Sequence, residues 1–386
     1  MFNDMRIYVI VGMFMTAGIA LMLFNYIIIR YSKGQNSSVA GRTKKWKKIL
    51  YRQTGIAGGK KQSNFKHEKL LEKHLSNIEN LVAYSNALQY IKSEFPVVYS
   101  GYIGSVYTVF HNLAIVYGRK PSIERACFAD FVCNFPEVSA QGDTFSPLTE
   151  ALISFADDPN IHCRTNALRA LCGIGNAQAV ANALQVINDK QMFIHSQTLT
   201  VELSNFKGNR EALADYLWNK SENWNDNIKV AVIGFITGFS KHYKEAFLPV
   251  LRDNTTSAGV RIAIIRYFGK YIYNPVRLVL IDMIKNVTDI NLAIVAATAL
   301  EFYPAADTIT TLQSALSNQN WHVRYNAASS IVNIGDRRSL REIMRSNDNR
   351  EKEIVTYMLE REGVQEGNDN LVAVAIVKTN KDKISA

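Results

Sequence analysis

Cysteine and proline are scarce in this sequence. Its four cysteines, in a chain of 386 residues, form no CxxC pair and do not have the spacing of zinc ligands. A chain of this length does not need disulfides for stability, so we expect the four thiols, at Cys127, Cys133, Cys163 and Cys172, to be reduced core residues. Eight prolines, 20% charged residues and 47% hydrophobic residues do not indicate disorder, so the sequence predicts a folded body.

Motifs of catalysis are also missing. No GxSxG, HExxH or complete phosphate-binding loop occurs, and the seven histidines are scattered. The run TGIAGGKKQS at residues 54–63 lacks the first glycine and the final Ser or Thr of a phosphate-binding loop. We therefore predict no catalytic, cofactor-binding or metal-binding residues, and we interpret the protein as a binding protein rather than an enzyme.

The positive charge is confined to one end of the chain. Residues 1–64 hold eleven Lys or Arg and one acid, which accounts for the whole net charge of +10. From Phe65 onward 33 basic residues face 33 acidic ones. Because phosphate neutralisation supplies most of the affinity for nucleic acid, a neutral body argues against a nucleic-acid partner.

One long apolar run precedes the basic cluster. Residues 7–29 carry no charge, and as a helix at about 1.5 Å per residue they would cross a hydrocarbon core of about 30 Å. The main basic cluster follows this run rather than precedes it, which argues against a cleaved signal peptide and favours a cytoplasmic flank. We predict a single-pass protein of the cell membrane, with residues 1–6 outside and everything after Arg30 in the cytoplasm.

The predicted membrane helix also offers a packing face. Gly12, Thr16 and Ala20 follow at steps of four residues, a spacing that lets a second membrane helix approach closely. Asn25 adds a polar group that favours a hydrogen-bonding partner over lipid. An integral membrane protein is therefore one expected partner, although small residues are common in membrane helices in any case.

Residues 30–64 are predicted as a basic juxtamembrane linker. Lysines and arginines of residues 33–61 could bind anionic lipid headgroups, or they could act only as a topology signal followed by a flexible linker. Both interpretations remain open from the sequence.

A repeat of about 32 residues organises the rest of the chain. Residues 161–175 superimpose on residues 321–335 with His, Arg, Asn, Ala, Ile and Gly in common. Between them the first apolar position of each unit recurs at intervals of 31 to 33 residues, namely at Cys163, His195, Ile228, Val260, Leu292 and Val323. Residues four and eight places further on share one helical face with it. Such units must stack to bury that face, which predicts an all-α superhelix of helix pairs.

The repeat resembles the second helix of a HEAT repeat. Val323, Arg324, Ala327, Ile331 and Gly335 follow the pattern V-R-x-x-A-x-x-x-L-x-x-I-G, whereas Ser196, Lys229 and Ala293 replace its arginine in other units. The resemblance implies a HEAT-repeat solenoid that acts as a scaffold. We place capping helices at 65–120, with 65–94 as one amphipathic helix and 97–117 as a buried helix rather than a second membrane span, repeats at 121–361 and a flexible tail at 362–386.

In such a solenoid the second helices line the concave side. We expect their exposed positions to bind a protein partner and name six candidates there: Asn166, Arg169, Thr198, Arg266, Asn326 and Ser329. The plan resembles bacterial single-span HEAT proteins that accompany membrane glycosyltransferases of surface polysaccharide synthesis. Alternatives are a regulatory scaffold of another membrane assembly, or a HEAT-like enzyme such as a DNA glycosylase or a bilin lyase.

Overall fold

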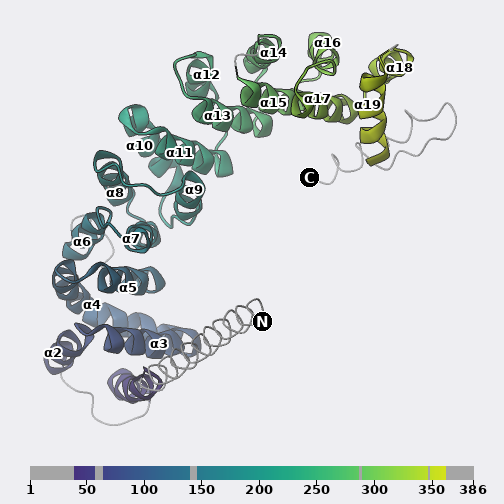
Figure 1. Cartoon of the computed structure of the whole chain (residues 1–386). Coiled ribbons are helices and arrows are strands. Elements are labelled where there is room, and N and C mark those ends of the chain that lie inside the picture. The colour runs from purple at the N-terminus through teal and green to yellow at the C-terminus, as the bar shows by residue number, and fades with distance from the viewer. Residues whose placement is uncertain (1–38, 57–63, 140–145, 287–288, 347, 362–386) are drawn as a thin grey trace, which may run out of the picture. The chain divides into compact units, whose positions relative to one another are not determined.

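The computed structural model describes residues 39–56, 64–139, 146–286, 289–346 and 348–361 (Figure 1). Every regular element in these ranges is a helix, which confirms the predicted all-α class. The described residues form two compact units, with residues 39–193 and 205–209 in unit 1 and residues 194–204 and 210–361 in unit 2.

Among the helices of the described residues, none combines the length and the apolar composition that a membrane crossing requires. This includes the helix that covers residues 97–117, which the sequence analysis assigned to the folded body. The predicted membrane segment 7–29, with Gly12, Thr16, Ala20 and Asn25, lies outside the described residues, as do residues 1–6 and the tail 362–386.

Unit 1 begins with a helix over residues 39–54. The helices that follow are α2 (Asn64–Leu75), α3 (Ile78–Glu94), α4 (Pro96–Gly118), α5 (Ser122–Asn134), η1 (Pro136–Val138), α6 (Pro147–Phe155), α7 (Ile161–Ile174) and α8 (Ala177–Asp189). First helices contact first helices, in the order α2, α4, α6 and α8, while α3, α5 and α7 contact one another in the same way. Each helix pair therefore stacks on the next.

Unit 2 continues the same alternation. Its helices are α9 (Ser196–Ser204), α10 (Arg210–Lys220), η2 (Ser221–Asn223), α11 (Asp226–Phe239), α12 (Lys244–Arg252), α13 (Ala258–Lys270), η3 (Asn274–Val276), α14 (Arg277–Lys285), α15 (Ile290–Ala299), η4 (Leu300–Phe302), α16 (Ala306–Ala315), α17 (Trp321–Ile334), α18 (Arg337–Arg345) and α19 (Asn349–Arg361). The second helices α9, α11, α13, α15, α17 and α19 each contact the next (Figure 1).

The face predicted from the 32-residue period is the buried face. All residues four and eight places after the first position are buried: Ala167, Leu199, Val232, Ile264, Ala296, Ala327, Leu171, Leu203, Ile236, Phe268, Leu300 and Ile331. Apolar surface removed from water stabilises by about 25 cal/mol per Å², so these buried residues contribute to the stability of each unit. The predicted register of the repeats is therefore confirmed.

One first position departs from the prediction. His195 is exposed and precedes α9, and its Nδ1 accepts a hydrogen bond of 3.2 Å from the backbone N–H of Gln197. The neighbouring Ile194, 1% exposed, is buried instead. The expectation that His195 is a core residue was wrong. Helix α9 starts later in its repeat than α7 or α17 does, so His195 precedes the helix and accepts a hydrogen bond from a backbone N–H at its start.

Repeats 161–175 and 321–335 share residues that form hydrogen bonds with the turn before each helix. Asn160 and Asn320 cap α7 and α17, each accepting from the backbone N–H two residues on. Arg164 donates from Nη1 to the carbonyls of Asp158 and Pro159, and Arg324 does the same to residues 318 and 319. The arginine of the repeat thus satisfies backbone carbonyls that the turn leaves without helical partners.

The shared glycines end these helices. Gly175 and Gly335 have φ of 81° and 71°, the left-handed conformation that L side chains rarely adopt. Each backbone N–H bonds the carbonyl four residues back, on Leu171 and Ile331.

The N-terminal part of unit 1 differs from the sequence-based layout. Residues 39–54, assigned to a linker, form a helix whose Trp46 and Leu50 are 5% and 0% exposed. The helix expected over 65–94 is two helices, because Asn77 accepts from the N–H groups of Glu79 and Asn80 and so caps α3. The pair α4 and α5 stacks on α6 and α7 like a further repeat, so residues 65–120 are not a separate cap.

The cysteines agree with their predicted state. Cys163 and Cys172 are buried, Cys127 and Cys133 are half-buried, and none forms a disulfide. Burial raises the pKa of the Cys163 thiol to about 12, so it is protonated at neutral pH.

A buried polar group sits between α2 and α4. His67, 1% exposed, meets the hydroxyl of Tyr102 at 2.9 Å, and the Tyr84 hydroxyl lies 3.1 Å from the same oxygen. Burial lowers the pKa of His67 to about 4. Below its unfolded pKa of about 6.5, the unfolded chain binds more protons than the folded one.

The repeat register makes a testable prediction at Ile331, which is 1% exposed on α17. Ile331→Asp places an unpaired charge in the core and should lower the free energy of unfolding by several kcal/mol. Val201→Asp, on the 54% exposed Val201 of α9 in the same unit, is the matched control and should change it by less than about 1 kcal/mol. Chemical denaturation of both variants checks this, and equal losses would contradict the register.

A second prediction concerns pH. The stability that His67 contributes is present above about pH 6.5 and is lost as the pH falls toward 4, about 2 kcal/mol between pH 7 and pH 5. His67→Gln should reduce this acid sensitivity, whereas His162→Gln, at an exposed histidine of the same unit, should keep it. Denaturation of the three proteins at both pH values measures the difference. Parallel pH curves for wild type and His67→Gln would rule the explanation out.

Candidate protein-binding site

The two candidate residues of unit 1 lie on α7, and both take part in interactions within the fold. Asn166 donates from Nδ2 to the carbonyl of Ala126 on α5, at 3.1 Å. Arg169 on the same helix is half-buried. The Asn166 amide therefore ties two second helices together, which is a packing role that the repeat pattern alone does not reveal.

The four candidates of unit 2 have different surroundings. Thr198 on α9 is exposed and Ser329 on α17 is half-buried. The Asn326 side chain accepts from the Thr298 hydroxyl at 3.0 Å and donates to the carbonyl of His322. Arg266 on α13 is exposed and makes no hydrogen bond or ion pair with a described residue. Of these residues, Arg266 is the one whose charge is available to a ligand.

Arg266 borders a pocket between α13 and α15. The pocket has a volume of ≈ 460 Å³ and is lined by Ile265, Arg266, Gly269, Lys270, Val295, Thr298, Ala299 and Phe302. Phe302, in η4 at the end of α15, is 43% exposed. Arg266 and Thr298, which lie six places after Val260 and Leu292, thus line one apolar depression.

The charge around this pocket is positive. Arg266 and Lys270 are its charged residues, and no acidic side chain lines it. The Lys270 ammonium donates to the carbonyls of Thr237 and Gly238 at the end of α11, which fixes its position. An apolar group flanked by a carboxylate is the chemistry that this pocket fits best.

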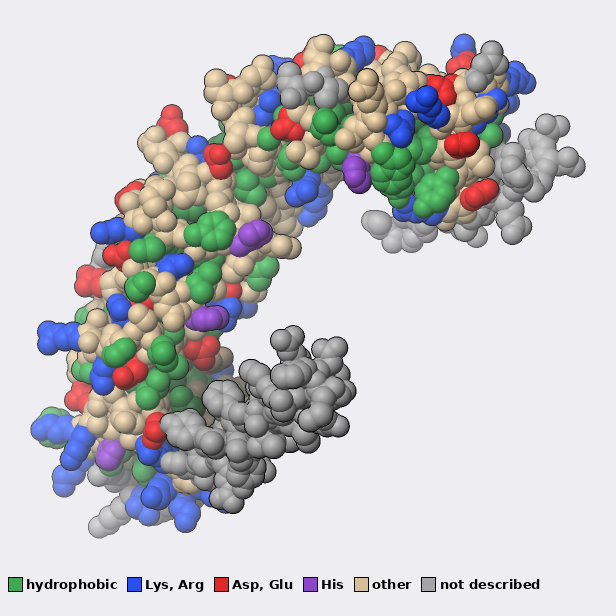
Figure 2. All heavy atoms as spheres, viewed as in Figure 1, with side chains coloured by type: hydrophobic (Ala, Val, Ile, Leu, Met, Phe, Trp, Pro, Cys, Tyr) green, Lys and Arg blue, Asp and Glu red, His purple; other side chains and the backbone are tan. Residues whose placement is uncertain are grey.

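A second pocket follows on the next two second helices. It lies between α17 and α19, has a volume of ≈ 370 Å³ and is lined by Trp321, Arg324, Arg350, Glu353, Ile354 and Tyr357. Trp321 and Tyr357 are 51% and 52% exposed. Figure 2 shows hydrophobic side chains gathered over α17 and α19, with Lys, Arg, Asp and Glu around them.

Aromatic rings support one another beside this pocket. The rings of Trp321 and Tyr325 lie 4.8 Å apart, and the Arg361 guanidinium stands 5.8 Å from the Tyr325 ring centroid. Partly exposed Trp, Tyr and Arg are the residues that carry most of the energy in protein interfaces. We call the exposed set Arg266, Lys270, Phe302, Trp321, Arg350 and Tyr357 the second-helix face of unit 2.

Sequence reasoning missed most of this face. It followed the rows three and six places after the first position, whereas Lys270 and Phe302 lie ten places after Val260 and Leu292. Trp321 precedes its first position, and α19 was treated only as a closing helix. The signal that could have identified Phe302 was an aromatic residue at a surface position where the other repeats have small or polar residues.

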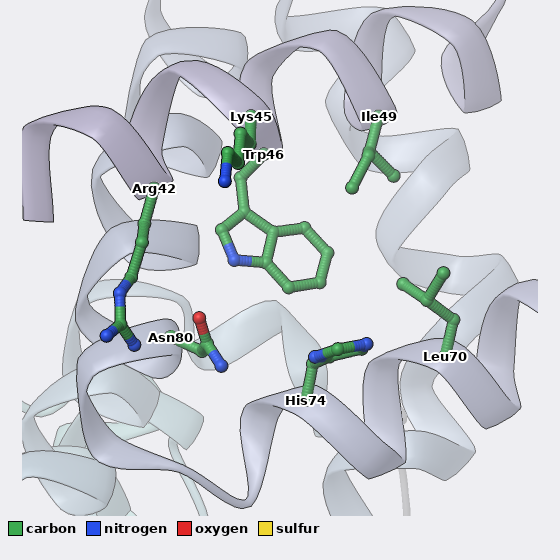
Figure 3. Close-up of a pocket in the computed structure, with 7 residues that line it drawn as sticks. All are labelled: Arg42, Lys45, Trp46, Ile49, Leu70, His74 and Asn80. Atoms are coloured by element: carbon green, nitrogen blue, oxygen red, sulfur yellow. The ribbon is translucent and has the colours of Figure 1, made fainter. Parts of the chain in front are cut away.

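Unit 1 has a pocket of different character. Arg42, Lys45, Trp46 and Ile49 of helix 39–54 surround it together with Leu70 and His74 of α2 and Asn80 of α3, enclosing ≈ 290 Å³ (Figure 3). The Trp46 indole forms its wall, at 6.4 Å from the His74 ring. Arg42 is paired with Glu79 at 2.5 Å, whereas Lys45 at this opening forms no ion pair with a residue that the structure describes.

Within the part of the chain that the structure describes, no group of three or more His, Cys, Asp or Glu side chains could hold a metal ion.

The comparisons with known proteins concern the fold. Residues 277–360, from α14 to α19, match the family of HEAT repeats. No curated protein matches the sequence. A solved structure of human deoxyhypusine hydroxylase in complex with glycerol aligns with 78% of this chain and 98% of its own, at 11% identity and a TM-score of 0.26.

This last comparison corrects one expectation. The sequence analysis interpreted the protein as a non-enzyme partly because HEAT solenoids are mostly scaffolds, yet the aligned protein is a hydroxylase. At this identity and TM-score the alignment transfers no reaction to this chain.

The repeat family over α14–α19, the buried 32-residue register and the stacked helix pairs lead to one conclusion. The described residues fold as an α-solenoid of stacked helix pairs, and residues 277–360 within it match the family of HEAT repeats.

Proposed function

We propose that this protein binds a protein partner through the second-helix face of unit 2. The observation that carries the proposal is the composition of that face. In the described part of unit 2, the large aromatic residues with more than a third of their surface exposed are Phe302, Trp321 and Tyr357. All three lie on second helices or their extensions. Burying such residues against a partner is favourable because they combine large apolar area with few rotatable bonds.

The two pockets define the kind of partner segment. The pocket between α13 and α15 takes an apolar side chain beside a carboxylate, since Arg266 and Lys270 flank its apolar wall. The pocket between α17 and α19 offers Trp321, Tyr357 and the cation of Arg350, with Glu353 at its edge. An extended segment with apolar residues at intervals and acidic residues between them matches this sequence of pockets.

Membrane attachment completes the proposal. Residues 7–29 would hold the chain in the cell membrane as a single span, with the repeats in the cytoplasm, as the charge distribution predicts. The partner would then be an integral membrane protein. The plan of one apolar segment before HEAT repeats resembles bacterial proteins that accompany membrane glycosyltransferases, so a glycosyltransferase of surface polysaccharide synthesis is the first partner to look for.

The test compares partner recovery among variants of the full chain. Trp321→Ala combined with Tyr357→Ala removes two aromatic anchors, and truncation of such residues costs about 1–4 kcal/mol each in protein interfaces. Recovery of the partner from membranes solubilised in mild detergent, quantified by isotope-labelled mass spectrometry, should fall by about tenfold or more. Arg266→Glu should reduce it separately through charge reversal.

Leu278→Ala is the matched control, because Leu278 is 62% exposed but lies on the first helix α14. It should leave partner recovery unchanged. Melting curves of all variants confirm that they are folded. If every co-purifying protein is recovered equally with the double variant and with the control, the second-helix face is not the binding site.

A further inference from the structure

Helix 39–54 has one buried face and one basic face. Trp46 and Leu50 are buried, and the Trp46 ring packs at 5.3 Å from the ring of Tyr84 on α3. On the opposite side, Lys44, Lys48 and Arg52 follow at steps of four residues and are all exposed. The helix contains no acidic residue.

The cations of this helix divide into two groups. Arg42 pairs with Glu79, and the Lys47 ammonium stands 3.6 Å from the Tyr90 ring centroid, so both serve packing within unit 1. The remaining exposed cations form no hydrogen bond or ion pair with a described residue: Lys44, Lys45, Lys48 and Arg52. We call these four residues the basic stripe. Lys45 also opens onto the pocket around Trp46 (Figure 3).

Helix α2 extends the positive surface. Lys66, Lys69 and Lys73 are exposed and lie opposite the buried Leu71. At the start of the same helix Phe65 is 64% exposed, with the Lys69 ammonium 4.3 Å from its ring centroid. Lys and Arg side chains gather at the end of unit 1 where helix 39–54 and α2 lie (Figure 2).

The chain itself indicates what covers this surface. Nine residues separate the apolar segment 7–29 from residue 39, and even fully extended they reach about 30 Å. If residues 7–29 span a membrane, the basic stripe must lie close to its cytoplasmic surface, where anionic lipids attract cations over roughly a Debye length. A nucleic-acid ligand fits less well, because the chain from Phe65 onward has no net charge.

We infer that helix 39–54 and the start of α2 dock unit 1 on an anionic membrane surface. The basic stripe contacts lipid phosphates, and the Phe65 ring enters the headgroup region. This inference depends on the membrane segment of the proposed function but not on the second-helix face. It assigns the basic cluster to a folded, oriented surface rather than to a linker.

The full chain in lipid nanodiscs provides the test. Discs of phosphatidylcholine alone are compared with discs that contain about 30% phosphatidylserine, and exposed lysines are acetylated by an amine-reactive ester and quantified by mass spectrometry. Labelling of Lys44, Lys45 and Lys48 should fall several-fold in the anionic discs, whereas the exposed Lys241 and Lys285 of unit 2 should not change. About 0.5 M NaCl should remove the protection, because it shortens the screening length to roughly 4 Å.

Two variants with equal charge change separate a local surface from general cation attraction. The triple variant Lys44→Gln, Lys48→Gln and Arg52→Gln should lose the protection of Lys45 and Lys66. Its matched control is Arg337→Gln, Arg341→Gln and Arg345→Gln, which removes three exposed arginines at the same four-residue spacing on α18. The control should keep the protection.

The outcomes distinguish failure of this inference from failure of the membrane anchor. Co-elution with neutral discs reports insertion of residues 7–29 by itself. A chain that does not insert is tested by flotation, and it should float with phosphatidylserine vesicles and not with neutral ones. Equal lysine labelling in the two lipids, or stronger protection by a short DNA duplex than by phosphatidylserine, would overturn the docking surface.

Discussion

Burial of one apolar helical face against the next repeat is the interaction on which this structure depends. A single helix pair cannot remove its apolar row from water, so each second helix covers the row of its neighbour. Alanine stands four places after the first position in several units, at Ala167, Ala296 and Ala327. Its small side chain allows neighbouring helix backbones to approach closely. Because every pair relies on its neighbours, the surface left exposed on the second helices is also continuous within each unit.

Several polar side chains of the stacked helices form hydrogen bonds with backbone carbonyls inside the fold. Arg164 and Arg324 bond the carbonyls of the turns that precede their helices, and Asn166 bonds the carbonyl of Ala126 across two second helices. Ser330 similarly donates to the carbonyl of Ala297. Buried or half-buried backbone groups need such partners, and side chains that supply them are unavailable to a ligand. A polar residue on a repeat surface is therefore a binding residue only when its own hydrogen bonds are not consumed by the fold.

Among the described residues, two surfaces are candidates for binding. One is aromatic with scattered cations and belongs to the second helices α13–α19, which suits a protein segment. The other is basic and belongs to helix 39–54 and α2, which suits an anionic surface. The two surfaces differ in what they bind. Burial of aromatic side chains requires a partner of complementary shape, whereas exposed lysines attract negatively charged groups whatever their shape. We propose that the two surfaces bring a protein partner and a membrane together.

The sequence alone determined the helical class, the 32-residue period and the buried face. These features follow from a local pattern of apolar residues that is present in each repeat. It also determined the caps Asn160 and Asn320, whose side chains act on the next two residues. Tertiary structure alone decided that His195 is exposed, that residues 39–54 pack as a helix, and that Phe302 joins Arg266 at one pocket. Those outcomes involve contacts between residues about thirty or more places apart, such as Ser196 with Asn227, Trp46 with Tyr84 and Arg266 with Phe302, which a local pattern does not encode.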